Sequence, residues 1–91
     1  MLERDVEAYF RKAVLKAGGV AFKFTSPSHR GVADRIVCFP GQTWFIELKR
    51  PGGRLSPLQR VFAAEMERLG QRYACLWDRE GVDEWLLTTT K

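Results

Sequence analysis

Asp34, Glu47 and Lys49 stand at a spacing that brings them together on one face of a β-hairpin. Two apolar runs flank Pro40-Gly41, and this dipeptide is typical of the turn between two strands. With a two-residue loop, Asp34 falls directly opposite Glu47. Lys49 then shares their face, because side chains alternate along a strand.

Two carboxylates this close repel each other, so the pKa of one rises unless a cation lies between them. Mg²⁺ suits such a gap, since it prefers oxygen ligands and is usually held by one or two carboxylates plus phosphate and water. Lys49 could then orient a water or neutralise charge on a phosphate. The alternative is an ordinary hairpin with an exposed Glu-Lys pair, and the spacing alone leaves both interpretations open. The other face of the hairpin is expected to be buried through Trp44, Ile46 and Leu48.

The composition predicts one soluble globular domain over residues 1–91. Hydrophobic residues make up 45% of the chain and charged residues 29%, which is ordinary for such a domain. No apolar run approaches the ~20 residues of a membrane span. The first ten residues carry acids early, unlike a signal peptide. We therefore expect a cytoplasmic protein with no membrane partner.

Cysteine and histidine usage argues against zinc chemistry. Cys38 and Cys75 lie in apolar runs and form no CxxC pattern, so both are expected to be small buried hydrophobes in a reducing compartment. His29 is the only histidine, which disfavours a histidine zinc site or a two-histidine nuclease. The net charge of +4 permits binding to a polyanion without establishing it.

A helix is expected over residues 3–17, where apolar residues recur at helical spacing and Gly18-Gly19 ends the pattern. Glu7 lies at the edge of the apolar stripe. It either pairs with Arg11 at i+4 in solvent or points toward the hairpin as a third carboxylate.

A strand follows over residues 20–24, with Val20, Phe22 and Phe24 on one face. The loop after it carries His29 and Arg30 and runs into the first strand of the hairpin. It is either a phosphate contact or a solvated connection.

Beyond the hairpin, Ser56 as N-cap, proline at the first helical position and Gln59 at the third predict a helix that ends near Gly70. The capping box gives Gln59 a complete structural explanation. A last strand over residues 72–77 and a short helix through Leu87 follow, with a frayed tail. The order α-β-β-β-α-β-α, with a crossover long enough to be parallel, predicts an α/β fold with a central mixed sheet flanked by helices.

These motifs resemble the PD-(D/E)xK nuclease superfamily and, more narrowly, the virus-type replication-repair nuclease (VRR-Nuc) family. The resemblance rests on GVADRIVCF, WFIELKRPGGRLSPLQ and the closing strand and helix, and it covers nearly the whole chain. It implies a restriction-endonuclease-like fold. With no appended domain, the chain is similar to stand-alone bacterial and phage members, which implies the cytoplasm of a bacterial or phage-infected cell.

The resemblance also implies roles for individual residues. Asp34 and Glu47 would bind Mg²⁺ or Mn²⁺ with help from the backbone carbonyl of Leu48, and Lys49 would be the catalytic lysine. Glu7 matches the acid of the family's first helix.

One further position matches the family and one departs from it. Gln59 matches the family's catalytic glutamine, a role that competes with its place in the capping box. Ala33 stands where the family often has proline, which leaves the chemistry open and the register of Asp34 less certain.

The function implied is that of a metal-dependent DNA endonuclease similar to Holliday-junction resolvases, acting on branched or junction DNA. Basic residues expected to contact DNA are Arg30, Arg35, Arg50, Arg54, Arg60 and His29. Alternatives are a flap- or end-directed nuclease, a non-catalytic DNA-binding module and a small interaction protein.

A homodimer is expected, because cutting a junction symmetrically requires two active sites. The large apolar groups are more than the short helices are expected to cover: Trp44, Trp77, Trp85, Phe45 and Leu87. Phe45 lies on the face of the acidic pair, and residues 82–87 are the segment expected to reach across to a partner. The alternative is that these residues complete the core of the monomer.

Overall fold

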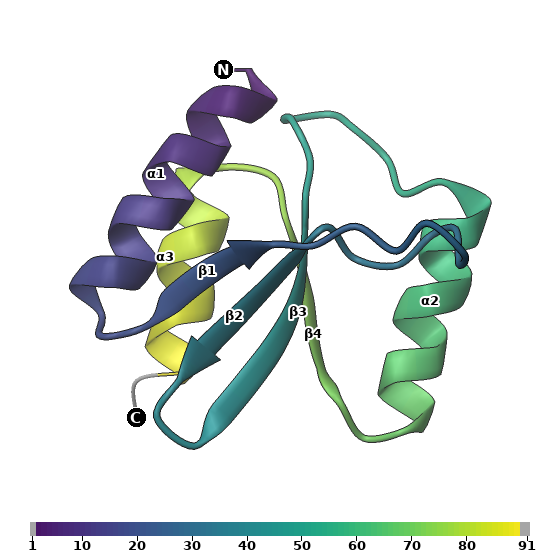
Figure 1. Ribbon diagram of the computed structural model, residues 1–91. Coiled ribbons are helices and arrows are strands. Elements are labelled where there is room, and N and C mark those ends of the chain that lie inside the picture. Colours follow the sequence, from purple (N-terminus) through teal and green to yellow (C-terminus); the bar gives the residue numbers. More distant parts are fainter. Residues whose placement is uncertain (1, 90–91) are drawn as a thin grey trace.

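The computed structural model describes residues 2–89 as a four-stranded sheet between helices (Figure 1). The elements, in chain order, are α1 (Glu3–Lys16), β1 (Val20–Lys23), β2 (Arg35–Phe39), β3 (Gln42–Leu48), α2 (Pro57–Arg68), β4 (Arg72–Leu76) and α3 (Arg79–Thr89). This confirms the order predicted from the sequence. Within the described residues, no helix is both long and apolar enough to cross a membrane.

The sheet is mixed, as predicted. Its strands lie in the order β1-β2-β3-β4, with antiparallel pairs at β1-β2 and β2-β3 and a parallel pair at β3-β4. Phe39 pairs with Gln42, so the loop between β2 and β3 has two residues, Pro40 and Gly41. Gly41 has a φ of 76°, which glycine adopts without the steric cost that other residues meet there. This turn fixes the register of the hairpin.

The core lies between the sheet and the helices α1 and α3, which cover the same side of it (Figure 1). Val6, Phe10 and Val14 are fully buried and confirm the apolar stripe of α1. The Trp85 ring stacks on Phe10, and Trp44 meets it edge-on, with centroids 5.6 Å apart in both pairs.

The aromatic groups expected at a dimer interface are thus largely used within the chain. Residues 82–87 belong to α3, where Val82 and Trp85 are buried, so this segment completes the core of its own chain rather than reaching across. Phe45 is not uncovered either. It packs edge-on against Phe62 of α2, with centroids 5.9 Å apart. The expectation that the monomer leaves Phe45 without a partner was wrong, because α2 covers that part of the sheet.

The helix α2 lies on the other side of the sheet, over β4, and its Phe62 ring reaches Phe45 of β3 (Figure 1). Its N-terminus confirms the predicted capping box: the Gln59 N–H donates to Ser56 Oγ at 3.2 Å, and the Ser56 N–H donates to Gln59 Oε1 at 2.8 Å. The loop between β1 and β2 packs closely on this helix at Gly31, where an added Cβ would lie 2.5 Å from the Leu58 carbonyl oxygen.

The half of the sheet that α2 does not reach remains open. Val20, Phe22 and Phe24 share one face, as predicted, but they are 44%, 54% and 38% exposed. Cys38 pairs with Val20 and is also exposed, so the expectation that both cysteines are buried was wrong for Cys38. The face formed by Val20, Phe22, Phe24 and Cys38 is called the β1 face below.

The chain end differs from the expected frayed tail. The helix α3 continues to Thr89, whose side chain is buried and whose carbonyl oxygen accepts from Gln42 Nε2 at 3.2 Å. Thr90 and Lys91 lie outside the described residues.

Candidate active site

Asp34 and Glu47 face each other across the β2-β3 hairpin. Arg35 pairs with Ile46 at the end of the observed register, so one further step brings Asp34 opposite Glu47. Glu47 is only 3% exposed. Asp34 is partly exposed, but its Oδ1 atom is buried and has no hydrogen-bond partner. The predicted pair of carboxylates is therefore formed.

Both carboxyl groups have raised pKa values. Burial, followed by the charge of Asp34, raises the pKa of Glu47 to about 7 despite the opposing charge of Lys49. Burial and then the charge of Glu3 raise the pKa of Asp34, and the backbone N–H groups of Asp34 and Leu48 only partly offset this. The site thus holds negative charge that its own side chains do not fully compensate.

The parallel pairing of β3 with β4 places residues of β4 next to the acidic pair. Glu47 pairs with Cys75, and the Lys49 N–H donates to the Leu76 carbonyl oxygen at 2.9 Å. Lys49 and Trp77 therefore follow at the carboxyl ends of two neighbouring parallel strands, the usual place for ligands in α/β sheets. Burial and then the charge of Glu47 raise the pKa of the Cys75 thiol to about 12, so this thiol stays protonated at neutral pH and is a poor nucleophile.

Two known proteins resemble the chain over most of its length. "Putative nuclease p44" of Acyrthosiphon pisum secondary endosymbiont phage 1 is 40% identical over 75 residues, which is 81% of each protein. A solved structure entitled "VRR_NUC domain" has a TM-score of 0.87 and 23% identity, covering 93% of this chain and 94% of that one. No protein-family profile matches the chain.

The chain belongs to the VRR-Nuc family of nucleases.

A divalent cation fits the acidic pair of this VRR-Nuc chain. The buried Oδ1 atom of Asp34 lacks a hydrogen-bond partner. Both carboxyl groups have raised pKa values, and a nearby positive charge would lower them by stabilising the ionised forms. Among residues 2–89, however, no three histidine, cysteine or acidic side chains gather into a metal cage. The arrangement suits Mg²⁺, which is often held by only one or two carboxylates and completes its shell with water and substrate oxygens.

Glu7 and Arg35 form an ion pair within the VRR-Nuc fold. The Arg35 guanidinium contacts the Glu7 carboxylate, lies 3.3 Å from Asp34 Oδ2 and is only 5% exposed as a residue. Its Nη1 also donates to the backbone carbonyl oxygen of Asp34 at 2.9 Å. Arg35 therefore joins α1 to β2, and we remove it from the arginines expected to contact DNA, because its charge is already paired and turned inward.

Glu3 is the acid of α1 whose charge acts on the site. It raises the pKa values of both Asp34 and Glu47, whereas Glu7 is engaged by Arg35. The role of Glu7 as a metal ligand stays a prediction, and nothing in the sequence indicated a role for Glu3. The two residues are four positions apart on one face of the helix, so only the docking of α1 on the sheet shows which partners each of them meets.

The remaining predicted site residues lie around this centre. His29, Arg30, Arg50, Arg54 and Arg60 are exposed, as a DNA-contacting role requires. Gln59 is held in the capping box at the start of α2, and its catalytic role stays a prediction. Trp77, which sequence reasoning considered only for an interface, adjoins Lys49 at the strand ends.

The raised pKa of Glu47 predicts a pH dependence of stability in metal-free VRR-Nuc protein. Between the ordinary value of 4.5 and about 7, the folded state holds a proton that the unfolded state releases. The free energy of unfolding should therefore fall as pH rises through this window, by on the order of 3 kcal/mol in all. Urea unfolding in EDTA at several pH values measures it.

The variant Glu47→Gln should show a flatter profile and should be more stable than the wild type at pH 8, where the wild-type carboxylate is ionised. Glu67→Gln, at an exposed glutamate of α2, serves as the control and should follow the wild type. A Glu47→Gln profile as steep as that of the wild type would contradict the assignment.

Proposed function

We propose that this VRR-Nuc chain is a Mg²⁺- or Mn²⁺-dependent DNA endonuclease that hydrolyses phosphodiester bonds at the Asp34–Glu47–Lys49 site. The observation that carries the proposal is the hairpin register, which sets two carboxylates with raised pKa values opposite each other and a lysine on the same face. Membership of a nuclease family supports it.

The acidic residues have the task of binding the cation. Asp34 and Glu47 would hold it, assisted by the backbone carbonyl of Leu48, and Glu3 would add negative charge from α1 in preference to the ion-paired Glu7. When bound, such a cation neutralises phosphate charge and lowers the pKa of a water molecule. One carboxylate alone would balance only half of the cation's double positive charge, so the pair of carboxylates suits a hard divalent ion.

Lys49 supplies the positive charge of the protein itself. Its backbone is fixed by the hydrogen bond from its N–H to Leu76, and its side chain follows Glu47 on the same face of β3. There the ammonium group can hold a water for in-line attack or stabilise the negative charge that develops on the phosphate.

Arg30, Arg50, Arg54, Arg60 and His29 would bind the DNA backbone. They are exposed and belong to segments next to the site, namely the loop before β2, the loop after β3 and the start of α2. Contacts of this kind position a duplex but carry little sequence information. We therefore infer a nuclease that recognises DNA shape, with branched or junction DNA as the preferred substrate.

Replacing Lys49 should separate cleavage from binding. Lys49→Ala should lower nicking of plasmid DNA in Mg²⁺ by at least about a hundredfold, in line with the loss of a group that acts in the transition state. DNA affinity should change little, because the acids and arginines remain. Lys16→Ala, at an exposed lysine of α1, is the control. Near-normal nicking by Lys49→Ala would remove this lysine from the mechanism.

Metal affinity should depend on the acidic residues in a defined order. Asp34→Asn and Glu47→Gln should each weaken Mn²⁺ binding by at least about tenfold, since a neutral amide is a poorer ligand for a hard cation. Glu3→Gln should weaken it more than Glu7→Gln, because the charge of Glu3 acts on both carboxyl groups, whereas Glu7 is ion-paired with Arg35. Calorimetric titration of each folded variant measures this. Unchanged affinity in both Asp34→Asn and Glu47→Gln would contradict the metal site.

We also infer a homodimer, assembled through the β1 face instead of the segment first expected. Val20, Phe22 and Phe24 are exposed apolar residues on one face at the edge strand β1, and uncovered apolar groups of this kind mark interfaces. A dimer would supply the two active sites that symmetric cutting of a four-way junction requires.

Sedimentation equilibrium at micromolar concentration should give a mass of about 21 kDa, twice the 10.5 kDa of one chain. Phe22→Lys should give the monomer mass, because a charge buried at an apolar interface is costly. Leu87→Lys, at an exposed leucine of α3 on the other side of the sheet, should stay dimeric. A monomeric wild type that still cuts a four-way junction symmetrically would overturn the dimer.

A further inference from the structure

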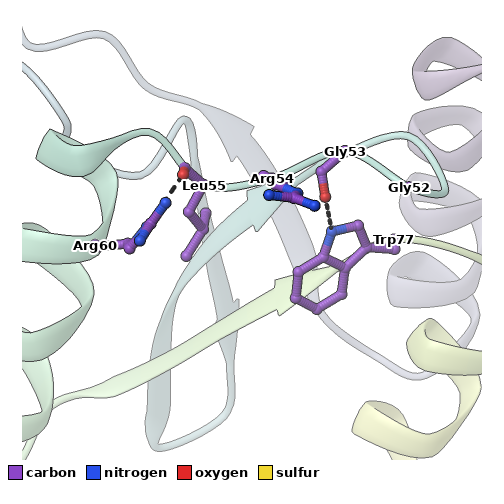
Figure 2. A pocket seen from close by; sticks show the side chains of 6 residues that line it. All are labelled: Gly52, Gly53, Arg54, Leu55, Arg60 and Trp77. Atoms are coloured by element: carbon purple, nitrogen blue, oxygen red, sulfur yellow. Dashed lines mark hydrogen bonds between the residues drawn. The ribbon is translucent and has the colours of Figure 1, made fainter.

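A pocket of about 560 Å³ opens between the loop after β3 and the start of α2. This volume lies in the range of small-molecule sites. Its lining residues are Gly52, Gly53, Arg54, Leu55, Arg60 and Trp77. In the view of Figure 2, Trp77 lies at one side of the pocket, Leu55 and Arg60 lie at the other, and Arg54 lies between them.

The pocket adjoins the acidic site through Lys49. An added Cβ on Gly53 would lie 3.5 Å from Lys49 Cβ, so the pocket loop packs directly against the base of the lysine. Continuing the β3-β4 register one step past Leu48 and Leu76 places Trp77 beside Lys49. A group in the pocket therefore lies next to Lys49 of the proposed cleavage site.

Trp77 is fixed in orientation and yet accessible. Its indole N–H donates to the Gly53 carbonyl oxygen at 2.8 Å, drawn as a dashed line in Figure 2. The residue is still 37% exposed. A tryptophan that served only to pack the loop would hide more of its ring, whereas a held, partly open ring is suited to stacking against a flat ligand.

Two unpaired arginines accompany the ring. Arg60 Nε donates to the Leu55 carbonyl oxygen at 3.3 Å, which directs this side chain along the pocket wall. In residues 2–89, no carboxylate forms an ion pair with Arg54 or Arg60. Their guanidinium groups are thus available to a phosphate, for which their geometry is well matched.

We propose that this pocket binds one unpaired nucleotide of the DNA, with its base stacked on Trp77 and its phosphate held by Arg54 and Arg60. Inside a duplex, a paired base has both faces covered by its neighbours, so an unpaired base is the one free to stack on a protein ring. No acidic or amide side chain lines the pocket, so recognition should have little base preference. The proposal rests on the proposed function, and it makes unpaired nucleotides beside the cleavage point part of the preferred substrate.

The test compares two DNA hairpins that differ only in their single-stranded tails. One tail has three thymidines and the other has three abasic nucleotides, so charge and length are the same. In EDTA, which prevents cleavage, the wild type should bind the thymidine tail about tenfold more tightly. Trp77→Ala should bind both tails equally, and Trp77→Phe should keep most of the preference. Leu87→Ala, at an exposed apolar residue of α3, is the control and should behave as the wild type.

The arginines are tested with the same hairpins. Arg54→Ala and Arg60→Ala should weaken binding to both tails. The logarithm of the binding constant falls linearly with the logarithm of the salt concentration, and each variant should reduce this salt slope by about one unit for every phosphate that it no longer neutralises. Arg72→Ala removes an exposed arginine at the opposite end of β4 and should leave the slope unchanged. An unchanged salt slope in both variants would contradict the proposal that Arg54 and Arg60 bind the phosphate of the nucleotide.

The results separate the pocket from the catalytic site. Equal binding of both tails by the wild type, or a Trp77→Ala variant that keeps the thymidine preference, would overturn the pocket even if the protein nicks plasmid DNA in Mg²⁺. If the wild type prefers the thymidine tail but cleaves no DNA in Mg²⁺ or Mn²⁺, the pocket stands and the proposed catalysis falls. Trp77→Phe guards against misreading a loss of folding, since it preserves the ring at this position.

Discussion

The repulsion between Asp34 and Glu47 is the constraint around which this molecule is built. The two-residue turn at Pro40-Gly41 forces the two carboxyl groups opposite each other, and the sheet places Glu47 almost fully out of solvent. The consequence is a glutamate that ionises only near pH 7. An arrangement of this kind lowers the stability of the metal-free fold, so its persistence is easier to understand if the charge is used to bind a ligand of opposite sign.

The charge arrangement of β2 shows how the fold tolerates the acidic pair. Asp34 faces the α2 side of the sheet, while its neighbour Arg35 faces the α1 side and reaches the Glu7 carboxylate. Arg35 thereby links α1 to the start of β2. The same guanidinium also contacts the carboxylate and the backbone carbonyl oxygen of Asp34. Removing one member of a buried pair leaves the other uncompensated. Arg35 is therefore better understood as support for the site than as a contact to DNA.

Local sequence signals predicted the hairpin and the helices well. A turn dipeptide, strand alternation and a capping box act over a few residues, so the register of Asp34 and Glu47 and the start of α2 could be predicted without the fold. The features that the sequence did not predict depend on how the helices pack on the sheet. The influence of Glu3 on the acidic pair and the pairing of Glu7 with Arg35 both depend on how α1 docks. Whether Phe45 is covered depends on which side of the sheet the crossover helix packs.

The same limit explains why the sequence alone did not predict the burial of Arg35 or the place of Trp77. Composition cannot tell which one of many arginines turns inward, since all carry the same charge and only packing distinguishes them. Trp77 follows β4, and Lys49 follows β3, so the two are 28 positions apart and meet only through a parallel pairing whose register no local sequence signal specifies. Residues 20–24 show the reverse case: alternation predicted the shared face of Phe22 and Phe24 correctly, but not that α2 leaves it open.

The two sides of the sheet divide stability from chemistry. The α1 and α3 side holds the fully buried side chains, whereas α2 contributes none and covers only β3 and β4. The acidic pair lies on this thinly covered side. Enough protein surrounds Glu47 to raise its pKa, because burial disfavours the charged form, yet Asp34 and Trp77 remain accessible. A thicker layer would shut the substrate out, and a fully open face would let water screen the charges on which binding depends. Partial cover by one short helix reconciles these two requirements.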